Sequence, residues 1–509
     1  MAVDVTEVRS VGWWMKRLGA QLLAERKRLQ LLQDWYDGEP PIAKDDENYR
    51  RYRDMARQSR TNLAALAVSA RGNRMRPRAI RTSVDADLEG DEIAWKLWRA
   101  SRLQVEASTC HRMFLSLSRA YVVVGTPDDG SDPLATVEDP RQVIAATDAF
   151  GRVVAALKLA HDDIAEEDQA TLWLPGQMHV AVRPRRATPA TAHRPVVFAP
   201  AAFTLDEERA ETWDAEAMRA ATGTAVPVVA FATEDGKGVF EKHLGLLERI
   251  DRGTFRRDSI ALLQAFRQRA LIGDVDDAED EREDLALDDD GEAASGGEEA
   301  VRRTEDLDDV LSADPGALWT LPEGVKLWES GQVDLTPLQV SKRDDVKEFA
   351  AVTSTPLSMV TPDAAAQSAE GASLQREGLT FAVEELREIA GVGWAHVASL
   401  LLYGAGEDER AALTGIVMEW MPAERHSLDS RANAAVAAKN SGVPWATRMS
   451  DIWGFDPEKV ARMREERQED LLLDLATGQA TPAPPAAAAP ASTAPAEGAP
   501  VGEPVTAGA

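Results

Sequence analysis

Cysteine is almost absent from the sequence, which contains Cys110 alone. A single thiol excludes an intramolecular disulfide framework and any zinc site built from clustered cysteines. Long apolar runs are missing as well: the nearest to one, Val397 to Tyr403, is far shorter than the roughly 20 residues that span a bilayer. The first residues include Asp4 and Glu7 and lack the apolar core of a secretory signal. We therefore expect a protein that assembles in the cytoplasm without a membrane partner.

Basic residues are scarce relative to acidic ones. The 509 residues include 57 Lys and Arg against 86 Asp and Glu, which gives a formal charge of −29. A protein that holds nucleic acid by neutralising phosphates is disfavoured by this balance. An acidic surface is still compatible with DNA as a passenger, because a wall that repels phosphate keeps DNA from adhering.

Motifs for catalysis are also missing. The sequence has no Gly-x-x-x-x-Gly-Lys-Ser/Thr phosphate loop, no Gly-x-Ser-x-Gly elbow and no His-Glu-x-x-His pair. Gly391-Val392-Gly393 lacks the third glycine of a dinucleotide site and falls inside a helical pattern. None of the seven histidines pairs with another at metal-ligand spacing. We predict no catalytic residue, no cofactor and no metal site, although paired-acid chemistry among 86 carboxylates is open.

Hydrophobic periodicity predicts an α+β protein. Helical spacing covers residues 11–35, 60–72 and 88–118, and the long pattern over 241–272 contains no proline. Between them, short β-branched runs separated by turn residues predict strands. These runs are Tyr121–Val124, Val153–Leu159, Thr171–Leu174, Val180–Val182, Val196–Phe198 and Val226–Phe231.

The second half of the sequence changes character after Gly273. Residues 274–300 contain fourteen Asp or Glu and a single Arg, a composition typical of a solvated segment. Residues 318–335 predict two short strands around the turn at 322–324. Helices are expected over 337–353 and 369–403, on either side of a loop of small residues.

Three short helical patterns cover residues 427–475. A DNA-binding helix-turn-helix is disfavoured there, because the candidate recognition segment has few basic residues. Residues 476–509 are almost entirely Ala, Pro, Gly and Thr with a few acids, and are too poor in large apolar residues to fold.

The order of these segments resembles the portal family of long-tailed phages. The pieces that carry the resemblance, in chain order, are Trp35-Tyr36-Asp37-Gly38, Asn62-Leu63-Ala64, the helix and strand from Trp95 to Val124, Glu138-Asp139-Pro140-Arg141, Pro227 to Phe231, the long helix ending Phe266 to Gly273, an insert, a Leu-Pro-x-Gly hairpin, a short helix, a Thr/Pro loop and a second long helix. The loop lacks the glycine that the family often places before Pro356.

The resemblance implies a portal fold, assembled as a ring of usually twelve subunits around a central channel. Its parts would be an α+β wing (1–240), a stem helix (241–273), a clip with the acidic insert (274–336), a second stem helix (337–353), a tunnel loop (354–368), a long wing helix with the segment after it (369–426), a helical crown (427–475) and a disordered tail (476–509).

The resemblance also implies a structural role in DNA packaging and ejection at a capsid vertex of the virion. The expected partners are further copies of the chain, major capsid and scaffolding proteins, the terminase large subunit, a head-tail adaptor and double-stranded DNA. The expected DNA-facing tunnel-loop residues are Ser354, Thr355, Pro356, Leu357, Thr361, Gln367 and Ser368. Stem arginines expected to face DNA or to bridge neighbouring subunits are Arg249, Arg252, Arg256, Arg257, Arg267 and Arg269.

Two alternative functions are open on the sequence alone. Another virion or connector protein would not need two long helices around a small-residue loop. An acid-dependent hydrolase would need a pocket that contains carboxyl groups of raised pKa.

Overall fold

A computed structural model describes residues 5, 7–41, 53–85, 90–127, 130–186, 195–265, 269–272, 326–329, 331, 333–360, 369–424, 428–455 and 457–477. The chain divides into two compact units, Met1–Pro457 and Glu458–Ala509. Among the described helices, none is long and apolar enough to cross a membrane.

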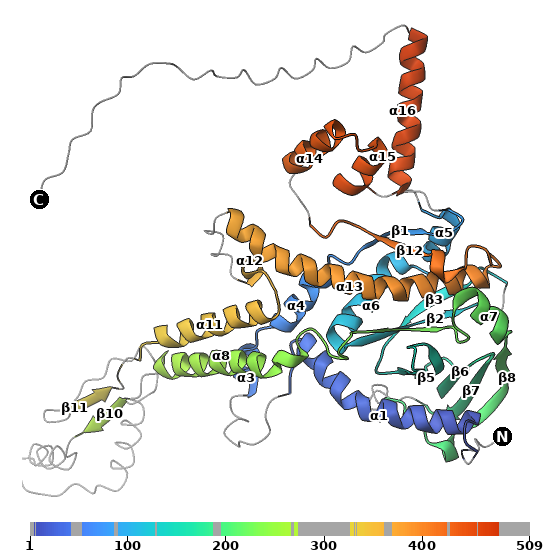
Figure 1. Cartoon of the computed structure of the whole chain (residues 1–509). Coiled ribbons are helices and arrows are strands. Elements are labelled where there is room, and N and C mark those ends of the chain that lie inside the picture. The colour runs from blue at the N-terminus through green and yellow to red at the C-terminus, as the bar shows by residue number, and fades with distance from the viewer. Residues whose placement is uncertain are drawn as a thin grey trace, which may run out of the picture. The chain divides into compact units, whose positions relative to one another are not determined.

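The first unit contains a five-stranded antiparallel sheet in which each strand pairs with the next along the chain (Figure 1). Its strands are β4 (Val143–Thr147), β5 (Val153–Asp162), β6 (Glu167–Leu174), β7 (Gln177–Pro184) and β8 (Thr204–Thr212). Helix α1 (Val11–Tyr36) packs on one face, where Met15, Leu18 and Leu22 join a core with alternate sheet residues such as Leu157 and Leu172. Because side chains alternate between the two faces of a strand, Val143, Ala156 and Trp173 of the same sheet join a second core on the opposite face.

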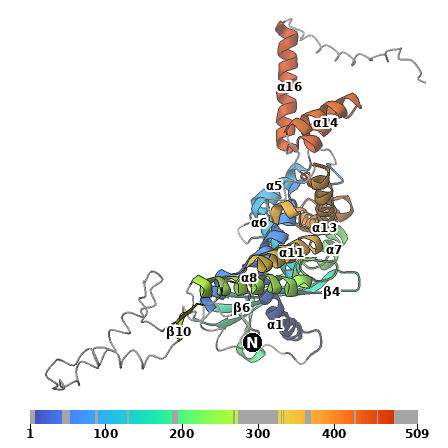
Figure 2. The same ribbon diagram turned by 90° about the vertical axis from the view of Figure 1, so that its left-hand side faces the viewer.

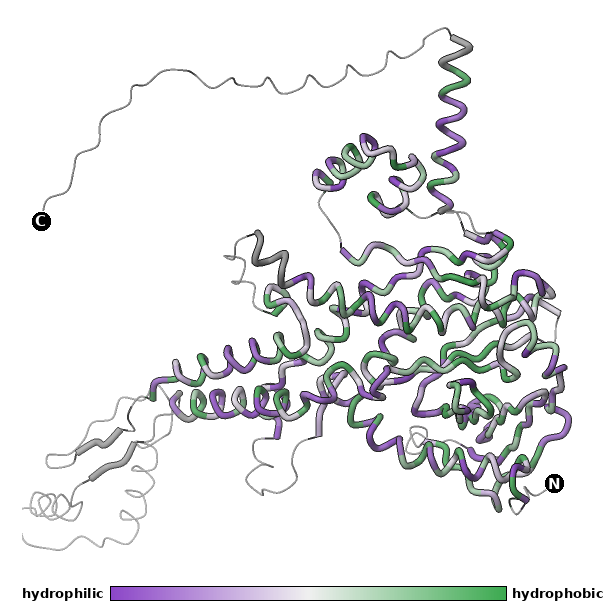
Figure 3. The backbone as a smooth tube through the Cα atoms, in the orientation of Figure 1, coloured by the Kyte–Doolittle hydropathy of each residue, from purple (hydrophilic) through white to green (hydrophobic). Residues whose placement is uncertain are grey.

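A larger core lies around a three-stranded antiparallel sheet in the order β3-β2-β9. The strands are β2 (Arg119–Gly125), β3 (Leu134–Glu138) and β9 (Val228–Ala232). The helices around it are α4 (Leu63–Gly72), α5 (Glu92–Ala100), α6 (Leu103–Leu117), α7 (Ala215–Thr222) and α13 (Ala369–Gly404). Figure 3 shows hydrophobic residues gathered along these strands and along the part of α13 that lies beside them.

Two antiparallel helices, α8 (Leu244–Ala265) and α11 (Thr336–Val352), lie side by side and extend away from the sheets (Figures 1 and 2). Strand β10 (Arg269–Ile272) follows α8 and pairs antiparallel with β11 (Lys326–Glu329), from Arg269 opposite Glu329 to Ile272 opposite Lys326. The short helix α3 (Arg53–Gln58) packs against α8.

The remaining elements complete the two units. β1 (Pro77–Arg81) pairs antiparallel with β12 (Val417–Trp420). The short elements are 3-10 turns at Pro200–Ala202, Glu241–His243 and Leu413–Gly415, helices α12 (Leu357–Val360), α14 (Leu428–Asn440) and α15 (Trp445–Thr447), and a π-helix at Arg448–Ile452. The described part of the second unit is helical and belongs to α16 (Pro457–Thr477).

The α+β class is confirmed, but several predicted elements were wrong. The helix predicted over 88–118 breaks at Ser101 and Arg102, where Arg102 adopts a left-handed conformation with φ +57°. The helix predicted over 241–272 is helical only over Leu244–Ala265 after a 3-10 turn. Residues 196–198 form no strand, although Val196 and Phe198 pack against the five-stranded sheet.

Of the hairpin predicted within residues 318–335, only the second strand falls among the described residues. That strand is β11, which pairs with β10 from the other side of the insert. Residues 273–325 and 476–509, except for the helical residues at 476 and 477, lie outside the described residues, so the predictions for the acidic insert and the tail are untested.

Candidate functional site

The paired helices α8 and α11 meet along an apolar seam at the end nearest the sheets. Leu247 and Ile250 of α8 are buried there, as are Val346 and Phe349 of α11. Further from the sheets, every described side chain of α8 beyond Thr254 and of α11 before Val346 is exposed or half-buried. The apolar seam therefore anchors the pair at one end only.

Polar contacts from the segment before α4 support the same end of the helix pair. The backbone N–H of Thr61 donates to Asp251 Oδ1 of α8 at 2.9 Å, and Lys342 Nζ of α11 donates to Thr61 Oγ1 at 3.4 Å. Burial raises the pKa of Asp251 and lowers the pKa of Lys342. Ser59 adds a hydrogen bond to Asp258 Oδ2 at 2.9 Å. Residues 59–61 thus contact both helices.

The structure pairs three of the four described α8 arginines with carboxylates of the same subunit. Arg249 bonds to Glu348 and lies 3.0 Å from Asp345 Oδ1 of α11, and these carboxylates raise its pKa. Arg252 pairs with Glu248 one turn earlier. Arg257 Nη2 lies 2.7 Å from Asp258 Oδ1.

Arg256 is exposed and makes no ion pair with the described part of the chain. Of the other predicted stem arginines, Arg267 lies outside the described residues. Arg269 begins β10 opposite Glu329 of β11, so its position on the stem helix was predicted wrongly. The contribution of Arg256 to DNA contact or subunit contact stays a prediction.

A tight turn connects α11 to the predicted tunnel loop. The N–H of Thr355 donates to Ala350 O at 2.8 Å and the N–H of Ser354 donates to Ala351 O at 3.1 Å, the pattern of a Schellman motif. Ser354 occupies the left-handed position with φ +46°, where glycine is usual and a side chain costs roughly 1–2 kcal/mol. Ser354 therefore occupies a strained backbone conformation that a glycine would adopt without this cost.

A buried arginine fixes this turn from another element. Arg71, in the last turn of α4, bonds to Thr353 O and donates to Ala67 O at 3.0 Å. Burial lowers its pKa to about 10. Thr353 Oγ1 also donates to Phe349 O at 2.6 Å and lies 2.9 Å from Thr355 Oγ1. The start of the loop is thus a rigid, internally bonded corner.

The predicted loop residues divide into three groups. Ser354 is exposed, and Leu357, the first residue of α12, is half-buried. Thr355 and Pro356 are buried within the subunit, so neither presents its side chain to a ligand in this conformation. Thr361, Gln367 and Ser368 lie outside the described residues.

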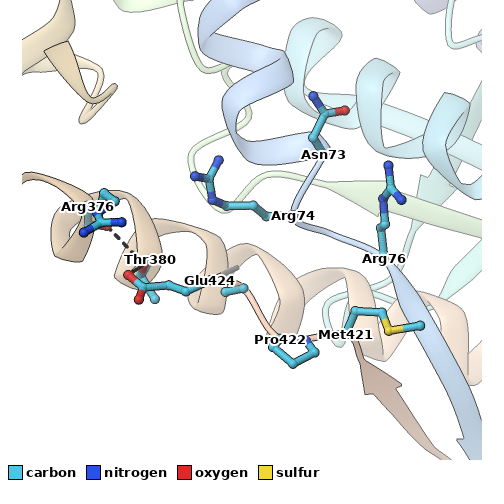
Figure 4. A pocket seen from close by; sticks show the side chains of 9 residues that line it. Asn73, Arg74, Arg76, Arg376, Thr380, Met421, Pro422 and Glu424 are labelled. Carbon is cyan, nitrogen blue, oxygen red and sulfur yellow. Dashed lines mark hydrogen bonds between the residues drawn. The ribbon is translucent and has the colours of Figure 1, made fainter. Parts of the chain in front are cut away.

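The sequence analysis missed an arginine-rich segment that runs from the end of α4 to the end of β1. Residues 71–81 contain five arginines and no acid, which was visible in the sequence as a local reversal of the acidic composition. Arg78 and Arg81 pair with Glu419 of β12. Arg74 and Arg76 instead line a pocket together with Arg376 of α13 (Figure 4).

A metal-binding cluster is not present among the described residues, where no group of three or more His, Cys, Asp or Glu could hold an ion. The buried histidine, His111, accepts a hydrogen bond from Trp394 Nε1 at 2.8 Å, and burial lowers its pKa to about 3. Cys110 is buried, and burial raises its pKa. Both are interior packing residues in this structure.

The geometry defines a mixed helix and sheet protein with a projecting helix pair and a fixed turn beside a basic pocket. A family model described as "Phage portal protein, SPP1 Gp6-like" matches residues 16–281, more than half of the 509 residues. The chain belongs to this portal family.

Two curated relatives are portal proteins of mycobacteriophages. The portal protein of Mycobacterium phage D29 is 34% identical over 102 residues, which cover 18% of this chain and 21% of that protein. The portal protein of Mycobacterium phage L5 is 33% identical over 100 residues, which cover 18% of this chain and 20% of that protein. The chain thus matches about a fifth of the length of these relatives.

Solved structures similar to the chain come from gene transfer agent particles. A chain of the native particle's virion has a TM-score of 0.41 at 12% identity, covering 84% of this chain and 97% of that one. A chain of the neck of the empty particle, computed with C6 symmetry, has a TM-score of 0.42 at 14% identity, covering 77% of this chain and 89% of that one. A chain of the neck of the native particle, computed with C12 symmetry, has a TM-score of 0.43 at 12% identity, covering 80% of this chain and 94% of that one. These TM-scores are too low to carry an argument about this chain.

Proposed function

We propose that the chain is the structural subunit of a portal ring at a capsid vertex, through which double-stranded DNA is packaged and ejected. The observation that carries the proposal is the family match over residues 16–281. We infer twelve subunits per ring, a place in the virion after assembly in the host cytoplasm, and contact with major capsid and scaffolding proteins.

The exposed half of the helix pair α8–α11 supports assembly of the chain with further copies of itself. A straight helix of 22 residues, the length of α8, extends about 33 Å. Its half distant from the sheets buries no described side chain, and isolated helices of this kind are marginal in water. Neighbouring copies around a ring would cover these exposed faces.

The antiparallel order of α8 and α11 also suggests where other partners bind. Strands β10 and β11 follow α8 and precede α11, so both lie on the insert side of the helix pair. We propose that this end contacts the terminase large subunit during packaging and a head-tail adaptor afterwards. These partners would meet the most acidic segment of the sequence, residues 274–300.

Charge determines the expected relation to DNA. Twelve chains of −29 would carry about −348 in total (12 × −29), so strong sequence-independent DNA binding is disfavoured. DNA would pass through such a ring as a weakly guided passenger.

Electron microscopy of the purified full-length chain tests the proposal. We expect closed rings with an axial hole, and class averages would give the number of subunits. A monomer that persists at high protein concentration would contradict the ring. A truncation that removes residues 478–509 is the matched control, because these residues follow the last described helix and are expected to leave ring formation unchanged.

A further inference from the structure

The basic pocket beside the turn after α11 has a volume of about 390 Å³, within the range of about 300–1,000 Å³ typical of ligand sites. Its walls come from the α4–β1 connection, α13 and the segment after β12 (Figure 4). The lining residues are Asn73, Arg74, Arg76, Arg376, Thr380, Met421, Pro422, Ala423 and Glu424. Three arginines against one glutamate make the lining positive in a chain of charge −29.

A buried arginine holds two walls of the pocket together. Arg387 of α13 is 8% exposed, and its Nη2 bonds to Arg74 O and, at 2.7 Å, to Met421 O. The N–H of Met421 donates to Arg76 O at 2.9 Å, and the Arg387 guanidinium lies 5.7 Å from the Trp420 ring centroid. The backbone that carries Arg74 and Arg76 is thus fixed before any ligand arrives, which lowers the entropic cost of binding.

The charged groups that line the pocket interact with one another. Burial lowers the pKa of Arg74; the charge of Arg376 acts in the same direction, and Glu424 acts against both. Glu424 Oε1 also accepts from Thr380 Oγ1 at 3.2 Å. Arg76 is exposed and makes no ion pair with the residues that the structure describes. An anion in this pocket would therefore meet guanidinium groups already crowded by like charge.

Two walls of the pocket are connected, through short stretches of chain and one hydrogen bond, to residues that flank the predicted tunnel loop. Arg71 fixes the turn at Thr353, and Asn73, Arg74 and Arg76 follow it directly in the sequence. Arg376 lies within the first turns of α13, the helix that begins at Ala369 after the loop. A polymer that contacts the loop would pass close to these guanidinium groups.

We propose that Arg74, Arg76 and Arg376 bind a backbone phosphate of duplex DNA. This inference rests on the proposed portal function. Guanidinium groups suit phosphate because their parallel N–H donors bind two oxygens at once. A contact to phosphate alone carries no base sequence, which suits a channel through which any sequence must pass.

The test measures duplex binding by assembled full-length rings. A fluorescent duplex of about 20 base pairs is titrated at about 50 mM salt, with anisotropy as the readout. Arg76→Gln and Arg376→Gln are each expected to weaken binding by about 3- to 10-fold and to reduce the log–log salt slope by up to about 0.9, the value for complete loss of one phosphate contact. Arg76→Lys, which keeps the charge, is expected to retain most of the affinity.

Arg219→Gln is the matched control, because it removes the same charge from an exposed position on α7. If the rings form but the pocket variants bind like this control, or wild-type rings bind no duplex, the inference is overturned and the ring function stands. Absence of rings would instead contradict the proposed function.

Two competitors distinguish the ligand source. Complete displacement of the duplex by about 10 mM inorganic phosphate would assign the pocket to free phosphate and overturn the DNA assignment. Displacement by an oligo-glutamate peptide, with the same dependence on Arg76, would assign it to an acidic peptide and overturn it as well. Displacement by unlabelled duplex alone supports the proposal.

Discussion

Helix α13 and the pair α8–α11 are long helical elements of the same unit, but different forces hold them. The part of α13 that lies beside the three-stranded sheet is enclosed by the main core, with Ala390, Trp394 and Val397 fully buried. The pair α8–α11 is buried only where it leaves the sheets. Beyond Thr254 of α8 and before Val346 of α11, every described side chain is exposed or half-buried. The comparison indicates that packing within the chain stabilises α13, whereas the outer half of the helix pair gains little from apolar burial among the described residues.

The largest expected effect is the loss of Trp394 from the α13 core. Trp394→Ala removes a fully buried ring that contacts Trp98 and Phe231 and leaves His111 Nε2 without its donor. We expect a loss of about 3–5 kcal/mol of unfolding free energy, measured by urea denaturation followed by far-UV circular dichroism. Phe381→Ala is the control, since Phe381 is 62% exposed on the same helix, and an equal loss there would contradict the comparison.

A second prediction concerns acid. Burial lowers the pKa of His111 to about 3 in the folded protein, whereas its pKa in the unfolded chain is about 6.5. The unfolded chain therefore binds this proton more readily. The contribution of His111 to stability is complete above pH 6.5 and is lost as pH falls from there towards 3, by at most about 1.4 kcal/mol per pH unit.

The measurement is the urea midpoint between pH 7 and pH 4, compared with the same series for His111→Gln. The slope is expected to be shallower in the variant, and His396→Gln, at a half-buried position on α13, serves as the control. Identical slopes in all three proteins would refute the role of His111.

The turn between α11 and α12 joins the two regions, and a third prediction concerns its strain. Ser354→Gly is expected to raise stability by up to about 1 kcal/mol, because glycine adopts a positive φ without the steric cost. Thermal unfolding measures the effect. Ser358→Gly, within the adjacent α12, is the control and is expected to lower stability. A destabilised Ser354→Gly protein would show that the serine has an additional favourable contact.

The smallest effect is expected in the exposed ion pairs of the helix pair. Arg249→Gln removes contacts with Glu348 and Asp345, and exposed pairs of this kind contribute little to stability because solvent screens the two charges. The urea midpoint should stay close to that of the unchanged protein, and any small difference should shrink further at high salt. A loss as large as that of Trp394→Ala would invert the comparison.

Sequence patterns predicted the elements whose apolar residues are continuous or regularly spaced. Strands β2, β5, β6 and β7 follow β-branched runs, and α11 and α13 begin within a residue of their predicted starts. Edge strand β8 was missed because its acidic, mostly exposed residues lack an apolar face. The break at Arg102 was missed because no glycine or proline marks it.

Tertiary pairing determined the rest. Residues 269–272 continue the helical pattern of α8, but pairing with residues 326–329 makes them a strand. The basic pocket brings together Arg76 and Arg376, which lie 300 positions apart in the chain (376 − 76), and no local pattern could predict this. The resemblance identified the order of the segments, whereas the turn at Ser354 required the structure.

The β10–β11 ladder has a consequence for how this family can diversify. Because the chain leaves Ile272 and returns at Lys326 on adjacent strands, the segment between them starts and ends at one place. Doubling the length of a flexible loop with fixed ends costs only about 0.6 kcal/mol. Evolution, or an engineer, can therefore lengthen, replace or tag residues 273–325 while the helix pair keeps its register, which makes this ladder a natural site for grafting new docking modules.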